Sequence, residues 1–108
     1  MFDMNLGMMR EHAPSASRIL KAMANERRLM ILCHLNEGEH SVGELVKLLG
    51  ISQPALSQHL ARLRNDGLVM RRRLAQNIYY SLYGNAARAI IQSLYDFMLP
   101  HTGNRQEN

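Results

Sequence analysis

Two short helices joined by a three-residue connection give the strongest structural signal in this chain of 108 residues. Residues 41–44 have the S-x-x-E spacing of a capping box, which predicts a helix start there. Leucines follow at helical spacing, and Gly50 marks the end of that helix. Ser52 can cap a second helix, with Pro54 in its first turn, where a missing backbone N–H costs little. Two helices about a turn that contains glycine form a helix-turn-helix.

The second helix has two sides of different character. At 100° per residue, Leu56, Leu60 and Leu63 fall on one side, which predicts that they face the core. Small and amide side chains lie on the opposite side, which suits a helix that approaches the major groove of DNA closely. The opposite side and its flanks consist of Pro54, Ser57, Gln58, Ala61, Arg62 and Asn65.

Polar residues in and beside this helix are candidate DNA contacts. Gln58 can pair bidentately with adenine, and Arg62 with guanine or a phosphate. Ser52 and Gln53 lie at the helix N-terminus, whose free N–H groups favour a phosphate. His59 falls beside the leucine side, so a base contact and a packed, hydrogen-bonded histidine both stay open. A solvated polar face is the alternative for the whole set.

The chain as a whole is predicted to be mostly α-helical with one β-hairpin. Helices are expected over about 15–23, 26–35, 41–49, 53–66 and 85–98. Residues favouring β structure at 68–73 and 78–83 predict the hairpin strands. The connection between these strands lacks glycine, so a tight two-residue turn is not expected.

The predicted domain covers residues 15–99. Residues 1–14 are expected to form a mobile N-terminal segment, and residues 100–108 a mobile tail. A domain this small buries a limited core, which favours a dimer.

Basic residues are concentrated in the hairpin and the helix before it. The net charge is +4, yet the segment from Lys47 to Arg73 carries six cations against one carboxylate. Such a basic cluster predicts nucleic-acid binding. The hairpin would hold the phosphate backbone as a wing, and its tip would touch phosphate or the minor groove. The candidate wing contacts are Arg71, Arg72, Arg73, Gln76 and Asn77. The alternative for the arginines is a solvated edge strand protected by charge.

Four segments resemble the ArsR/SmtB-type winged helix-turn-helix regulators. They are residues 21–29 (KAMANERRL), 42–45 (VGEL), 52–60 (SQPALSQHL) and 75–80 (AQNIYY). The resemblance implies a cytoplasmic homodimer, formed through the first and last helices, that represses transcription at inverted-repeat operators until an inducer releases it. It further implies recognition-helix contacts to DNA from Ser52, Gln53, Ser57, Gln58 and His59.

The signal that such a regulator would sense is left open. Metal-sensing relatives use Cys or His/Asp ligands in the third or last helix, and the third helix here has no cysteine. A site from Asp96 and His101 is the one metal alternative, and no metal or cofactor is expected.

A single cysteine is the departure from part of this family. The chain resembles a subgroup that includes BigR-like, HlyU-like and NolR-like regulators. BigR-like and HlyU-like members pair two cysteines to sense thiol chemistry. Cys33 matches the first of these positions, but Met98 or Leu99 stands at the second. NolR-like members also lack the pair. Cys33 is therefore expected to be structural, with a single-cysteine redox or persulfide response as the alternative.

Other classes of function have little support. The longest apolar run, residues 29–33, is far shorter than the ~20 residues of a membrane span, and no secretory signal is evident. No GxGxxG, phosphate loop, HExxH or GxSxG motif is present, so no enzyme is expected. The prediction is a homodimeric repressor that binds double-stranded DNA at a palindromic operator. A winged-helix module that binds protein instead is the alternative.

Overall fold

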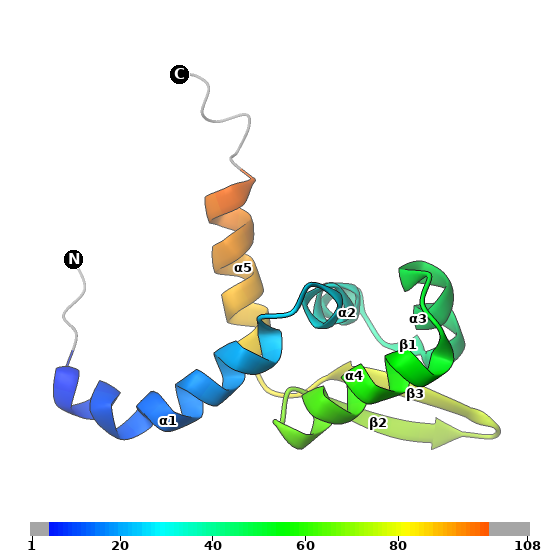
Figure 1. Ribbon diagram of the computed structural model, residues 1–108, viewed down its shortest axis with the longest axis horizontal. Helices are drawn as coiled ribbons and strands as arrows, with labels where there is room; N and C mark the ends of the chain where they lie inside the picture. The colour runs from blue at the N-terminus through cyan, green and yellow to red at the C-terminus, as the bar shows by residue number, and fades with distance from the viewer. Residues whose placement is uncertain (1–4, 100–108) are drawn as a thin grey trace.

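Five helices and three strands follow one another along residues 5–99, the part of the chain that the computed structural model describes (Figure 1). The elements are α1 (Leu6–Met23), α2 (Glu26–Glu37), β1 (His40–Ser41), α3 (Val42–Leu49), α4 (Gln53–Asn65), β2 (Val69–Leu74), β3 (Asn77–Leu82) and α5 (Ala86–Met98). This arrangement confirms the prediction of a mostly α-helical winged helix-turn-helix. The predicted tail, 100–108, and residues 1–4 lie outside the described part.

Side-chain caps begin three of the predicted helices. Asn25 accepts a hydrogen bond from an amide in the first turn of α2 at 3.0 Å. The capping box of α3 is complete, since Ser41 Oγ accepts from the Glu44 amide at 3.1 Å and Glu44 Oε1 accepts from the Ser41 amide at 2.8 Å. Ser52 Oγ accepts an amide hydrogen bond of α4 at 3.2 Å. Each such cap contributes about 1 kcal/mol, so local chemistry sets both helices of the helix-turn-helix.

Helix α1 begins at Leu6, and the predicted start near residue 15 is wrong. Asn5 caps the helix by accepting a hydrogen bond from the Met8 amide at 3.1 Å, and Pro14 lies inside it. Residues 6–14 are exposed. The apolar spacing used to predict helices reports packing against a core, so an exposed stretch gives no such signal.

The hairpin is tighter than the sequence suggested. Strands β2 and β3 are antiparallel, and Leu74 pairs with Asn77, so Ala75 and Gln76 alone form the turn. The expectation of a longer connection is therefore wrong. Ala75 has a φ of 58°, a left-handed conformation that costs a residue with a side chain roughly 1–2 kcal/mol. The pairing of β2 with β3 on both sides of the turn keeps Ala75 in this conformation.

A third strand, β1, was not predicted because two residues are too short for an alternating pattern. It pairs with β3 and makes the sheet order β1-β3-β2. The strand thereby joins the start of α3 to the hairpin.

Helix α2 lies at the centre of the core. It contacts α1, α3, α4, α5 and β3, and its Ile31, Leu32 and Leu35 are buried. The buried leucines of α4 belong to the same cluster. Helices α1 and α5 extend away from this body (Figure 1).

Candidate DNA-binding surface

The outward side of α4 has the polar residues that the sequence predicted. Leu56, Leu60 and Leu63 are at most 1% exposed, which confirms that their side of the helix faces the core. The exposed candidates in and beside the helix are Ser52, Gln53, Pro54, Ser57, Gln58 and Arg62. The helix therefore exposes hydrogen-bonding groups on the side away from the core.

His59 lies between the two sides of α4 and is partly buried. Burial first, and then nearby Arg28 and Arg27, lower the pKa of its imidazole. The lowered pKa favours the neutral ring, which can act as a hydrogen-bonding group.

Arg62 has an intramolecular partner. Its Nε donates to Oδ2 of Asp66 at 2.9 Å, one helical turn further on. Arg18 of α1 lies 3.9 Å from the same carboxylate. The bond uses Nε of Arg62 and not its two terminal nitrogens, so it orients the guanidinium and leaves those nitrogens available to another partner.

The strand register divides the three wing arginines between two faces of the hairpin. Successive residues of a strand alternate in direction, and directly opposite residues share a face. Arg71 lies opposite Tyr80, which is buried against the core, and Arg73 shares that face. Arg72 lies opposite Tyr79 on the other face. By register, Arg71 and Arg73 therefore share one face and Arg72 lies on the other, while all three line one hollow of about 240 Å³ together with Ile78.

Glu39, in the connection between α2 and β1, holds Arg72. Nε and one terminal nitrogen of Arg72 donate to the two carboxylate oxygens of Glu39 at 2.8 and 2.9 Å. The guanidinium also lies 5.2 Å from the centre of the Tyr79 ring. The hydrogen bond to Arg72 lowers the pKa of Glu39 and raises the pKa of Arg72. The partners are 33 residues apart, so no local spacing in the sequence could reveal this pair.

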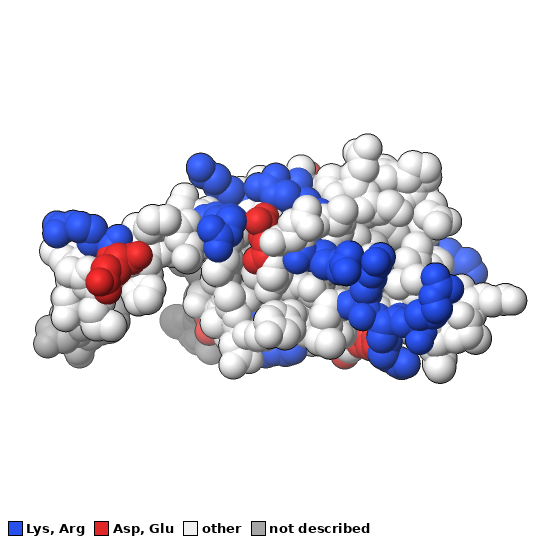
Figure 2. All heavy atoms as spheres, turned by 90° about the horizontal axis from the view of Figure 1, so that it is seen from below, with Lys and Arg blue, Asp and Glu red and all other residues white. Residues whose placement is uncertain are grey.

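The wing tip lies beside the start of α4. Gln76 and Asn77 line a hollow of about 230 Å³ together with Gln53. Val42 and Gly43 at the start of α3 line the same hollow. Figure 2 shows basic side chains gathered at the end of the molecule that holds the hairpin and α4. The predicted tip residues and the N-terminus of α4 thus lie on one surface.

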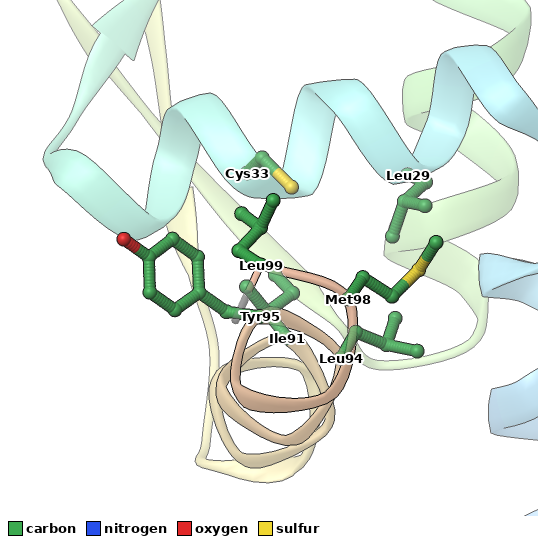
Figure 3. A pocket seen from close by; sticks show the side chains of 7 residues that line it. All are labelled: Leu29, Cys33, Ile91, Leu94, Tyr95, Met98 and Leu99. Carbon is green, nitrogen blue, oxygen red and sulfur yellow. The ribbon is translucent and has the colours of Figure 1, made fainter. Parts of the chain in front are cut away.

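An apolar pocket of about 290 Å³ lies between α2 and α5, away from that surface (Figure 3). Its lining consists of Leu29, Cys33, Ile91, Leu94, Tyr95, Met98 and Leu99. Burial, and then the nearby Glu37 carboxylate, raise the pKa of the Cys33 thiol, which disfavours the reactive thiolate.

Neither a metal site nor a membrane segment is found within residues 5–99. No three side chains of His, Cys, Asp or Glu lie close enough there to hold a metal ion. The alternative site from Asp96 and His101 is outside this description because His101 lies beyond it. Among the described helices, none is long and apolar enough to span a bilayer.

Comparison with known proteins gives consistent matches. A family model described as "Bacterial regulatory protein, arsR family" matches residues 25–71. The transcriptional activator HlyU of Vibrio cholerae is 53% identical over 92 residues, which are 85% of each chain. The structure of HlyU from Vibrio cholerae has a TM-score of 0.80 at 50% identity, over 84% of this chain and 99% of that one.

Two further solved structures are similar to this chain. The transcriptional repressor BigR from Xylella fastidiosa has a TM-score of 0.83 at 40% identity, over 88% of this chain and 97% of its own. A homodimeric winged helix-turn-helix DNA-binding domain from Mycobacterium bovis has a TM-score of 0.74 at 33% identity, over 94% of this chain and 95% of its own.

The raised pKa of Cys33 predicts slow alkylation. Because this is the only cysteine, iodoacetamide labelling of the folded protein reports on it alone. The pH midpoint of labelling should lie above that of the unfolded protein. Glu37→Gln removes the nearby negative charge and should lower the midpoint, whereas Glu11→Gln on α1 should leave it unchanged. A midpoint at or below that of the unfolded chain would contradict the account.

Proposed function

Because this chain belongs to the arsR family of bacterial regulatory proteins, we propose that it acts as a homodimeric repressor at an imperfectly palindromic operator. The chain is a DNA-binding transcriptional regulator, as its relatives are. The observation that carries the proposal is the polar outward side of α4, held in place by three buried leucines on its other side. This is the geometry of a recognition helix in the major groove.

In this proposal α4 reads bases and its N-terminus holds a phosphate. Gln58 pairs with adenine, and Ser57 contacts a neighbouring base edge. Ser52, Gln53 and Pro54 lie at the helix start, where free amides attract a phosphate. His59 serves as a neutral hydrogen-bonding neighbour, and Arg62 reaches DNA with the nitrogens that Asp66 leaves unbonded.

The wing adds sequence-independent affinity. Arg71 and Arg73 lie on the hairpin face directed toward the helices and neutralise backbone phosphates. Gln76 and Asn77 at the tip, beside Gln53, extend this contact to phosphate or the minor groove. Arg72 belongs to the wing but differs from the other two arginines because it is bonded to Glu39.

Exposed apolar side chains support dimerisation through α1 and α5. Both helices carry large apolar residues in solvent, which a monomer seldom leaves uncovered over a wide patch. On α1 they are Leu6 at 69% exposure, Met8, Met9 and Leu20, and at α5 they are Leu94, Tyr95, Phe97 at 83%, Met98 and Leu99. In the proposed dimer these helices pack against those of a second copy. The two recognition helices then meet half-sites about one helical turn apart.

The remaining expectations follow from this function. A DNA-binding repressor works in the cytoplasm, with no catalytic site and no cofactor. The raised pKa of Cys33 supports a structural role over a redox or persulfide response. The exposed cations beside α4 favour DNA over protein as the partner of the wing.

Gln58→Ala tests the placement of the recognition helix. Loss of one bidentate base contact should weaken operator binding by about 1–3 kcal/mol. The loss should appear only on DNA that carries the base that Gln58 reads. The measurement is a titration against DNA from upstream of the chain's own coding region and against copies with single base changes. Gln92→Ala on α5 is the matched control. Unchanged affinity and base preference in Gln58→Ala would show that α4 is placed wrongly.

Phe97→Glu tests the dimer. A carboxylate on the most exposed apolar residue of α5 should convert the dimer into a monomer, because burying an unpaired charge in an interface is costly. Sedimentation equilibrium measures the change. Leu48→Glu on α3, where the side chain is 51% exposed, should stay dimeric. A wild type that sediments as a monomer would refute the proposal.

A further inference from the structure

The one wing arginine on the outer face of the hairpin is bound to a carboxylate. Glu39 accepts two hydrogen bonds from Arg72 at 2.8 and 2.9 Å, and Tyr79 lies against the same guanidinium. No such partner is found for Arg71 or Arg73 within residues 5–99. Glu39 therefore distinguishes one arginine from its two neighbours.

We propose that Glu39 limits the affinity of the wing for DNA by holding Arg72 away from the phosphate backbone. The inference rests on the proposed function, because it concerns how tightly the same surface grips DNA. Glu39 is a positioning residue that acts through Arg72.

The geometry of the pair opposes a phosphate contact. Nε and one terminal nitrogen form one of the two sides of the guanidinium that can bind an anion bidentately, and Glu39 accepts a hydrogen bond from each of them. A phosphate that took these donors would have to displace the carboxylate and leave Glu39 charged beside DNA. Such an exchange replaces the Arg72–carboxylate pair with an Arg72–phosphate pair. It also adds repulsion between the freed Glu39 carboxylate and DNA, so the exchange yields no net attraction.

The ion pair between Glu39 and Arg72 affects the part of the DNA affinity that does not depend on base sequence. Each neutralised phosphate makes the dependence of log K on log salt steeper by about 0.9. Holding back one arginine in each protomer weakens binding to all DNA and leaves base reading by α4 untouched. Because of Glu39, this segment binds phosphates less tightly than its six cations together would.

Glu39→Gln removes the charge that holds Arg72, and Glu37→Gln removes an equal charge two residues earlier, with no described bond to the wing. The probe is a random-sequence DNA duplex, titrated at several salt concentrations. Glu39→Gln should bind more tightly, with a slope steeper by about 0.9 per protomer. The ratio of its affinity for DNA to that of wild type should fall about threefold per protomer when the salt concentration rises from about 50 to about 200 mM. Glu37→Gln should keep the wild-type slope.

The double variant Glu39→Gln/Arg72→Ala keeps the wild-type net charge and lacks the pair. It should bind DNA as wild type does, with the same slope. Thermal melting establishes that each variant is folded. The inference is overturned if Glu39→Gln binds no more tightly than Glu37→Gln, or if the double variant is weaker than wild type, which would mean that the paired Arg72 already contacts phosphate. Wild-type protein that binds no duplex at all would instead overturn the proposed function.

Discussion

Packing of three leucines on one side of α4 is the interaction on which the DNA-binding surface depends. Leu56, Leu60 and Leu63 are almost fully buried, and burial of each contributes roughly 1.5–3 kcal/mol. They pack into the cluster that surrounds α2, which contacts each of the other four helices. Their burial fixes the rotation of α4, and so the opposite side, with Gln58, faces outward. The N-cap of Ser52 fixes where that helix begins.

Charge on this surface is arranged by two carboxylates as well as by the cations. Asp66 accepts a hydrogen bond from Nε of Arg62 and leaves its terminal nitrogens unbonded, which orients that side chain on α4. Glu39 accepts from Nε and one terminal nitrogen of Arg72, and we propose that these two hydrogen bonds keep Arg72 from phosphate. The two ion pairs thus differ in the number of donors that they engage, one in Arg62 and two in Arg72. Net charge alone does not describe how many phosphates such a segment meets.

The sequence predicted the elements whose signals are local and failed where the signal is not. The capping box at Ser41 and the leucine spacing of α4 are local patterns, and both were confirmed. The start of α1 was missed because an exposed helix has no core-facing pattern. The two-residue turn at Ala75 depends on strand pairing and not on turn composition. The bond between Arg72 and Glu39 joins distant segments, which only the fold brings together.

Footprinting of the protein on DNA from upstream of its own coding region tests whether a symmetric dimer reads the operator. A dimer that inserts two α4 helices and grips backbone with two wings should protect two major-groove segments on one face of the duplex, about one helical turn apart and related by symmetry. Wing contacts should protect the backbone beside them. Protection of a single segment, or protection lost to an equal amount of random-sequence competitor, would contradict a symmetric, sequence-reading repressor.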